Sequence, residues 1–234
     1  MITMVIPVLN DAAPLAALLP GLPTVPVDPA VEIIVVDGAE ASDPAMDVLR
    51  ERYPGVTWMR SAPGRGAQMN EGARRARGRW LVFLHADTRL GAGWIDVLRR
   101  LDAQPRAAGG SFRFALDSPR RCARWIEWGV RIRVRLFDLP YGDQALFVRR
   151  ALFEELGGYR ELPLMEDVDF ILRLRRRGCL AHADVPALTS ARRWERDGWV
   201  RRTLENSVLL ALFLAGWPPE RLARRYRRGR TCGR

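Results

Sequence analysis

The sequence predicts an α/β fold with a mostly parallel central sheet and helices on both faces. Continuous apolar segments such as "VEIIVVDG" (31–38) are typical of strands buried on both faces, and they alternate with segments of helical periodicity. The chain has 234 residues, of which 48% are hydrophobic, so it is long and apolar enough to bury one substantial core.

Strands and helices alternate regularly in the first half of the chain. We expect strands at 2–8, 31–38, 56–61 and 79–87, and helices at 13–22, 45–53 and 66–78. Ligands of such open sheets bind beyond the carboxyl ends of the strands. The polar strand endings are therefore expected to meet at one crevice; they are Asn10–Asp11, Asp37–Gly38 and His85–Asp87.

The second half, after about Gly109, has a different sequence pattern, but no low-complexity linker separates it from the first half. We expect a strand at 109–116, a basic amphipathic helix at 118–137, a strand and short helix within 141–159, and a helix at 165–178. We therefore predict one domain at 1–199, in which 1–108 binds a ligand and 109–199 completes the site. A helical basic extension follows at 200–234.

The chain is strongly basic, with 38 arginines, no lysine and 27 acidic residues, which gives a net charge of +11. Two explanations stay open: a solvated basic surface, or an anionic partner such as a phosphate, a lipid headgroup or a nucleic acid. Cys122, Cys179 and Cys232 lack metal-binding spacing, which predicts reduced thiols in a cytoplasmic protein. No signal peptide is expected, and the longest apolar run, 208–217, is too short to span a bilayer.

Two motifs in the first half carry candidate chemistry, each with a plainer alternative. Gly64, Arg65 and Gly66 precede a helix, where backbone N–H groups and an arginine could bind an anion, or they form an ordinary turn. Asp87 follows a buried strand and could bind a divalent metal that neutralises a diphosphate, or it could cap a helix beginning near Ala92.

Acidic residues cluster at the start of the helix expected at 165–178. Glu166, Asp167 and Asp169 include a candidate general base, although carboxylates in a first turn also complement the helix dipole. In "SARRW" (190–194), arginines beside a tryptophan could clamp phosphates or stack on a base, and a solvated helix flank is the alternative.

In combination and in this order, the motifs resemble a family 2 glycosyltransferase of the GT-A fold over roughly residues 2–195. The resemblance rests on "VIPVLN", "EIIVVDG", "GRGAQMNEGARRARGRWLVFLHADTRL", "YGDQALFVRR", "LGGY", "MEDVDFILRLRRRG" and "SARRW". It implies a Rossmann-like half at 1–108 that binds a nucleotide sugar and an acceptor-binding half at 109–199. The chain also resembles the small bacterial branch found beside radical-enzyme and seleno- or arseno-sugar gene sets.

The resemblance implies a role for each matching position. Toward the donor it places Pro7, Asn10, Asp37, Arg65, Asn70 and His85; toward the acceptor it places Gly142, Asp143, Gln144, Arg193 and Trp194. Asp87 would bind the metal and Asp167 would act as the general base, with Glu166 beside it. One base, and no carboxylate placed as a covalent nucleophile, implies single displacement with inversion at the anomeric carbon.

Two positions depart from the family's pattern. The usual Asp-Asp of the second strand is Asp37-Gly38, which leaves open whether the donor is a UDP- or a GDP-sugar. The usual Asp-x-Asp is His85-Ala86-Asp87, so an imidazole replaces the first carboxylate. A neutral histidine is a poor ligand for Mg²⁺ but can serve Mn²⁺, or it could hydrogen-bond a phosphate or ribose. We expect a divalent metal, Mn or Mg, with its necessity open.

Other functions remain as alternatives. A sugar-phosphate nucleotidyltransferase shares the α/β layout, but "VLNDAAP" (8–14) lacks the glycine-rich, lysine-bearing loop of that class. A basic protein that binds a membrane surface or a nucleic acid is an alternative of another class, but it would leave the carboxylates at strand ends and helix starts unexplained. We therefore expect a nucleotide-sugar donor, a small-molecule or lipid-linked acceptor, and no nucleic acid. Segment 200–228 is either a packed helical region or a peripheral contact with the inner face of the membrane.

Overall fold

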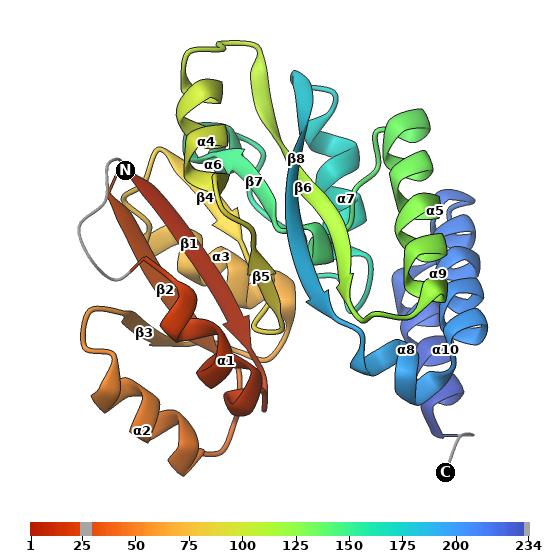
Figure 1. Cartoon of the computed structure of the whole chain (residues 1–234), viewed down its shortest axis with the longest axis horizontal. Coiled ribbons are helices and arrows are strands. Elements are labelled where there is room, and N and C mark those ends of the chain that lie inside the picture. Colours follow the sequence, from red (N-terminus) through yellow and green to blue (C-terminus); the bar gives the residue numbers. More distant parts are fainter. Residues whose placement is uncertain (24–29, 232–234) are drawn as a thin grey trace.

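A central sheet with helices on both sides organises the protein, as seen in the computed structural model, which describes residues 1–23 and 30–231 (Figure 1). Within these ranges the strands are β1 (Ile2–Val8), β2 (Val31–Asp37), β3 (Thr57–Arg60), β4 (Trp80–Phe83), β5 (Thr88–Leu90), β6 (Ala107–Asp117), β7 (Leu146–Arg149) and β8 (Cys179–Ser190). The α-helices are α1 (Ala12–Leu18), α2 (Pro44–Arg52), α3 (Arg65–Arg75), α4 (Trp94–Asp102), α5 (Arg121–Phe137), α6 (Arg150–Glu155), α7 (Glu166–Leu174), α8 (Arg192–Asp197), α9 (Trp199–Leu214) and α10 (Pro219–Thr231). Two 3₁₀ turns, η1 (Leu19–Gly21) and η2 (Gly142–Gln144), complete the set.

The sheet joins a parallel half to a mixed half. Its strand order is β3-β2-β1-β4-β7-β6-β8-β5. The first four strands in this order are parallel, as predicted, whereas β7 runs antiparallel to both β4 and β6. β8 pairs with β6 in parallel and carries β5 antiparallel on its other edge. The carboxyl ends of β1, β2 and β4 therefore lie at one edge of the sheet.

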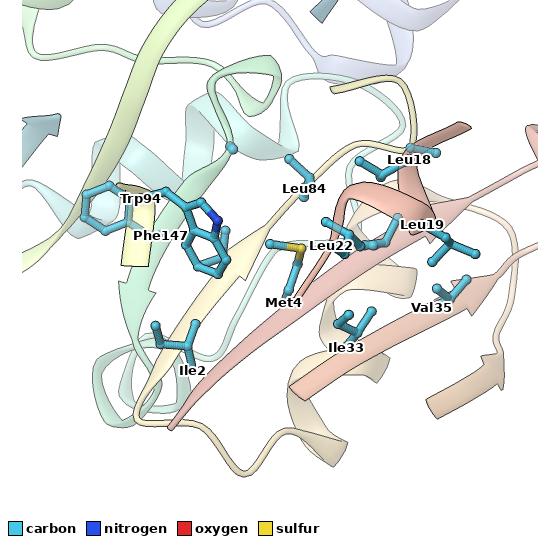
Figure 2. Close-up of a cluster of buried hydrophobic side chains, with 14 of the residues drawn as sticks. Ile2, Met4, Leu18, Leu19, Leu22, Ile33, Val35, Leu84, Trp94 and Phe147 are labelled. Atoms are coloured by element: carbon cyan, nitrogen blue, oxygen red, sulfur yellow. The ribbon is translucent and has the colours of Figure 1, made fainter. Parts of the chain in front are cut away.

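Alternating side chains of β1 build a hydrophobic core on each face of the sheet, because successive strand residues point to opposite sides. Met4 and Ile6 join the core covered by α1, α2 and α4, part of which is drawn in Figure 2. Val5 joins the opposite core, where α3, α6 and α7 supply residues such as Met69 and Phe170. Helices thus cover both faces, which confirms the predicted layers.

Two features differ from the sequence-based expectations. The strand at 179–190, which pairs along most of β6, is not among the predicted elements. Asp87 does not cap a helix: residues 88–90 form a short strand, and α4 begins at Trp94 after Gly93, whose φ is 84°. The extension after residue 199 folds into α9 and α10, which gather with α5 at the opposite end of the molecule from β2 and β3 (Figure 1). Across 1–23 and 30–231, no helix combines the length and the apolar character needed to cross a membrane.

Candidate active site

Gln68 of α3 fixes the carboxyl ends of β1 and β2. Its buried side-chain amide donates hydrogen bonds to the carbonyl oxygens of Val8 (2.6 Å) and Val36 (2.9 Å). A Cβ at position 38 would lie 2.8 Å from the Gln68 amide carbon, so Gly38 leaves the room that Gln68 occupies. The departure from Asp-Asp at this position therefore has a packing reason. Asp37 is buried; its Oδ1 accepts from Ala39 N at 2.9 Å.

The ends of β1 and β4 are joined through an arginine of α8. Arg192 donates to Asp11 Oδ1 at 2.9 Å, and the same nitrogen lies 3.4 Å from Asp87 Oδ2. Arg193 lies 3.9 Å from the same Asp87 oxygen. Burial is the main cause that lowers the pKa of Arg193, with Arg65 adding to it and Asp87 opposing it. Asp11 and Asp87, which belong to two of the three predicted polar strand endings, thus both lie close to the arginines of α8.

The three carboxylates at the start of α7 have three different partners. Glu166 Oε1 lies 3.3 Å from Arg65 Nε, which ties the start of α7 to the start of α3. Burial raises the pKa of Glu166, and Asp167 adds to this rise, whereas Arg65 opposes it. Asp169 is held by Arg160 at 3.0 Å and Arg173 at 2.8 Å. This pairing gives Asp169 a structural role.

Asp167 is the carboxylate of this cluster that backbone groups orient. Its Oδ2 accepts a hydrogen bond of 2.7 Å from the N–H of Gly142 in η2, and its Oδ1 accepts from Val168 N at 2.8 Å. A Cβ at Gly142 would lie 3.2 Å from both Asp167 Oδ2 and His85 Nε2. Glycine at this position therefore lets η2 pass close to both side chains.

Eight of the predicted side chains, from both halves of the chain, line a common cavity of about 110 Å³, which we call the reaction pocket. They are Arg65, His85, Asp87, Asp143, Glu166, Asp167, Arg193 and Trp194. Burial lowers the pKa of His85 to about 3, with a further lowering by Arg65 and Arg193, so its imidazole is neutral at neutral pH. Burial likewise raises the pKa of Asp143 to about 6. Acidic and basic groups thus share one confined site, which suits charge-separating chemistry.

Six of the predicted site residues do not line the reaction pocket: Pro7, Asn10, Asp37, Asn70, Gly142 and Gln144. The Asn70 amide is fully engaged with the backbone of Tyr159, donating to its oxygen and accepting from its nitrogen, both at 2.8 Å. Gln144 is buried, accepts from Tyr141 N at 3.2 Å and donates to Phe112 O at 3.2 Å. These two residues support the walls of the site. Pro7 is buried within β1 and Asn10 is exposed just after it, with a φ of 55°; neither lines the reaction pocket.

The C-terminal helices contribute residues to the reaction pocket that the sequence did not single out: Arg202 and Asn206 of α9 and Tyr226 of α10. Arg202 is buried and donates to the Tyr226 hydroxyl at 2.8 Å. Among the described residues, its Nε and Nη1 have no hydrogen-bond partner, although Nη1 lies 3.7 Å from carboxylates of Asp197 and Glu205. The composition shows that arginines are abundant, but it does not indicate which of them point into the reaction pocket.

A second, larger cavity of about 660 Å³ opens between α5 and α9; we call it the α5–α9 groove. Its walls are largely apolar and include Ile126, Val130, Trp199 and Leu204. Four residues line both the groove and the reaction pocket: Tyr141, Asp143, Trp194 and Asn206. The two cavities therefore adjoin one another at these residues.

Comparison with known proteins agrees with this architecture. The model of the family described as glycosyl transferase family 2 matches residues 3–157. An uncharacterized protein of Mycobacterium tuberculosis, MT1568, is 29% identical over 191 residues, which cover 69% of this chain and 57% of that protein.

Solved structures share the fold at low sequence identity. The mannosyltransferase PcManGT from Pyrobaculum calidifontis, in complex with GDP-Man and Mn²⁺, gives a TM-score of 0.65 at 18% identity and covers 92% of this chain and 63% of that chain. Residues 1–349 of S. aureus TarS, in complex with UDP-GlcNAc, give 0.59 at 14% identity, covering 80% of this chain and 58% of that one. The chain thus spans somewhat more than half the length of each relative. The fold is GT-A, and because the family model covers well over half of the sequence, the chain belongs to glycosyl transferase family 2.

Proposed function

We propose that the protein is an inverting glycosyltransferase that moves a sugar from a nucleoside-diphosphate sugar to an acceptor hydroxyl. The observation that carries the proposal is the reaction pocket itself, in which Asp167 and Asp143 share a cavity with Asp87 and the inward arginines. Family membership supports a nucleotide-sugar donor. The two structural relatives, one in complex with GDP-Man and the other with UDP-GlcNAc, support the same donor class.

Asp167 is the proposed general base. An alcohol is a poor nucleophile at neutral pH, so a positioned carboxylate accelerates its attack by taking the hydroxyl proton. In the proposed step, the acceptor oxygen bonds to the anomeric carbon while the bond from that carbon to the diphosphate oxygen breaks. The hydroxyl proton goes to Asp167, and the electron pair leaves with the nucleoside diphosphate. The backbone hydrogen bonds from Gly142 and Val168 favour a single orientation of the base.

Arginines are proposed to stabilise the leaving diphosphate. Arg65, Arg193 and Arg202 line the reaction pocket from three different elements. Guanidinium groups bind phosphate oxygens with charge-assisted hydrogen bonds, and donors that are already in place lower the cost of charge development. The buried and unpartnered Nε of Arg202 supports this role, because such a donor gains most from an anionic ligand.

Asp87 suits a divalent metal that a nucleotide carries with it. The described residues hold no group of three or more Asp, Glu, His or Cys side chains placed around a metal ion. Magnesium-type sites need only one or two carboxylates when phosphates supply further ligands, and Asp87 meets that need with a nearly buried carboxylate. His85 is neutral and could add a nitrogen ligand. A bound Mn²⁺ or Mg²⁺ would neutralise charge on the diphosphate.

The nucleoside is proposed to lie against the ends of β1 and β2, near Pro7, Asn10 and Asp37. Gly38 and the Gln68 hydrogen bonds shape this edge of the sheet. Whether the donor is a UDP- or a GDP-sugar is a question for experiment. Membership of the small bacterial branch that the sequence resembles also stays a prediction.

Peripheral contact with an anionic membrane is proposed for the end of the molecule that α5 and α9 form. Most large hydrophobic side chains that are exposed in the described ranges belong to α5, α9 or the turn after α9; they are Trp125, Trp128, Leu136, Phe137, Val200, Leu204, Val208, Leu214 and Trp217. Apolar side chains interspersed with arginines are typical of interfacial helices. In flotation with phosphatidylglycerol vesicles, we expect binding that Trp128→Glu weakens and Val48→Glu, on the distant α2, leaves intact.

A thermal-shift screen tests the proposed function. We expect UDP or GDP, or one of their sugars, to raise the melting temperature, since a ligand that binds only the folded state stabilises it. Manganese should enlarge the shift. Release of the nucleoside diphosphate from the matching nucleotide sugar then measures turnover. No shift with any nucleotide, with or without Mn²⁺, would contradict the proposal.

A further inference from the structure

The α5–α9 groove has the size and chemistry of a small-molecule site. Its volume of about 660 Å³ falls in the range of ligand pockets, and its walls are mainly hydrophobic and aromatic. The groove is also much larger than the reaction pocket that it adjoins. This apolar volume suits the hydrocarbon part of a ligand better than it suits a small polar acceptor.

The wall shared by the two cavities is held in place by specific contacts. Arg133 stacks over the Tyr141 ring, with its guanidinium carbon 3.5 Å from the ring centroid, and it also donates to Leu139 O at 3.1 Å. On the other side, Trp194 Nε1 donates to Thr203 Oγ1 at 3.3 Å. The junction between groove and reaction pocket is therefore largely preformed.

A polar group without a partner stands at this junction. Asp143 lines both cavities, and its Oδ1 is buried with no hydrogen-bond partner among residues 1–23 and 30–231. Native structures rarely leave a buried carboxylate oxygen unsatisfied, so such an atom points to a ligand group that donates to it. A hydroxyl at the polar end of an otherwise apolar molecule would satisfy Asp143 Oδ1.

We propose that the α5–α9 groove binds the body of an apolar acceptor alcohol, whose hydroxyl meets Asp143 at the junction and is delivered to Asp167. The inference rests on the proposed glycosyl transfer and names its acceptor class: an alcohol with an extended hydrocarbon body. The exposed apolar side chains of α5 and α9 around the groove would admit such a molecule from a lipid phase.

Cys122 provides a direct readout of groove occupancy, because it lines the groove and is a free thiol. In a Cys179→Ser/Cys232→Ser background it is the remaining cysteine of the chain. We expect 1-decanol to slow maleimide labelling of Cys122 at least fivefold at saturation, whereas glycerol and 1-butanol at equal concentration leave the rate unchanged. Equal labelling rates with and without 1-decanol would overturn the proposal.

Matched variants test whether 1-decanol protects Cys122 by binding in the α5–α9 groove. Leu204 lines the groove and is 60% exposed, and Val48 of α2 is 61% exposed and far from it in the fold. We expect Leu204→Glu to raise the half-protecting concentration of 1-decanol at least tenfold and Val48→Glu to leave it unchanged. Each rate is compared with that of the same variant without alcohol. Trp125→Glu, at a 71% exposed groove position, repeats the test if Leu204→Glu fails to fold.

Further outcomes separate this inference from the proposed function. A nucleotide-induced thermal shift without decanol protection overturns the acceptor class and leaves the transferase intact. Decanol protection without any nucleotide-induced shift overturns the acceptor role together with the transferase. Labelling of Cys122 that speeds up on dilution, without alcohol, shows that a second copy of the chain covers the groove, which also overturns the proposal.

Discussion

The N–H of Gly142 donates a 2.7 Å hydrogen bond to Oδ2 of Asp167, joining η2 to the first turn of α7. The two residues are 25 positions apart in sequence and belong to two motifs that the resemblance assigns to acceptor binding and to the base. One hydrogen bond therefore connects the turn that is proposed to bind the acceptor to the carboxylate that is proposed to take the proton.

Replacing Asp167 with asparagine should abolish sugar transfer. The amide keeps the shape of the carboxylate but cannot take a proton, so we expect kcat to fall by about 10²- to 10⁴-fold. Donor affinity, measured by calorimetry with the nucleoside diphosphate, should change less than threefold. Asp169→Asn is an unsuitable control because it breaks two ion pairs, so Asp184→Asn, at an exposed carboxylate, serves instead. Near-normal turnover by Asp167→Asn would assign the base elsewhere.

Gly142→Ala should impair catalysis more than it impairs stability. The new methyl group would sit 3.2 Å from both Asp167 Oδ2 and His85 Nε2, which is close enough to displace one of them by a few tenths of an ångström. Catalytic geometry is sensitive to displacements of this order, so we expect kcat to fall about tenfold or more. Thermal unfolding should show that the fold persists. Gly55→Ala, where an added Cβ has nothing within 4 Å and which lines neither cavity, is the matched control.

Asp87→Ala should remove the metal dependence of donor binding. Without this carboxylate, the nucleotide keeps its arginine contacts but its metal loses a protein ligand. In titrations of the nucleoside diphosphate, the gain in affinity caused by Mn²⁺ should disappear, while metal-free affinity stays similar. Asp117→Ala removes an exposed carboxylate that pairs with Arg89 and should behave as wild type. A manganese effect that survives in Asp87→Ala would move the metal site.

Arg202→Met should weaken donor binding without unfolding the protein. Methionine keeps much of the buried apolar contact of the arginine stem but cannot donate to a phosphate, so we expect the Kd of the nucleoside diphosphate to rise at least tenfold. Loss of the hydrogen bond to Tyr226 is offset by the removal of two buried N–H groups that have no partner, so the free energy of unfolding should change little. The neighbouring, exposed Arg201→Met should leave Kd unchanged.

Asp143→Asn should stabilise the ligand-free protein at neutral pH. Because burial raises the pKa of Asp143 from 3.8 to about 6, its stabilising contribution is complete below pH 3.8 and is lost as the pH rises through about 6. Asparagine does not ionise, so its advantage over wild type should grow by about 1–3 kcal/mol between pH 4 and pH 7. Urea unfolding at both pH values measures this difference. A constant difference would show that Asp143 titrates normally.

Local sequence patterns predicted most of the first half because strand, helix and cap signals there agree with the tertiary fold. Asp43 accepts from Ala45 N at 2.9 Å at the start of α2, as its position before Pro44 suggests. β8 escaped prediction since its sequence carries Pro186 and polar residues within the strand. It becomes a strand by pairing with β6, where a register shift next to Phe112 and Arg113 accommodates the proline.

For the site, strand ends and helix starts could be predicted, and inward-facing residues of the C-terminal helices could not. His85, Asp87 and Asp167 follow from where elements end and begin, and the structure brings all three to the reaction pocket. Arg202 and Tyr226 reach the same pocket through the packing of α9 and α10, and no local periodicity distinguishes Arg202 from Arg201. The contact of Asn70 could not be predicted either, because the backbone that binds its amide belongs to Tyr159, 89 residues away.

The two adjoining cavities draw their walls from separate parts of the polypeptide. The proposed chemistry depends on residues at strand ends and helix starts, whereas much of the groove comes from the surfaces of α5 and α9. Groove-facing side chains of those two helices, apart from those of α9 that also reach the reaction pocket, such as Arg202 and Asn206, can therefore be exchanged without touching the proposed base, the proposed metal ligand or the sheet. If the groove binds the acceptor as proposed, directed evolution of these groove positions changes the acceptor range while the proposed transfer residues stay constant.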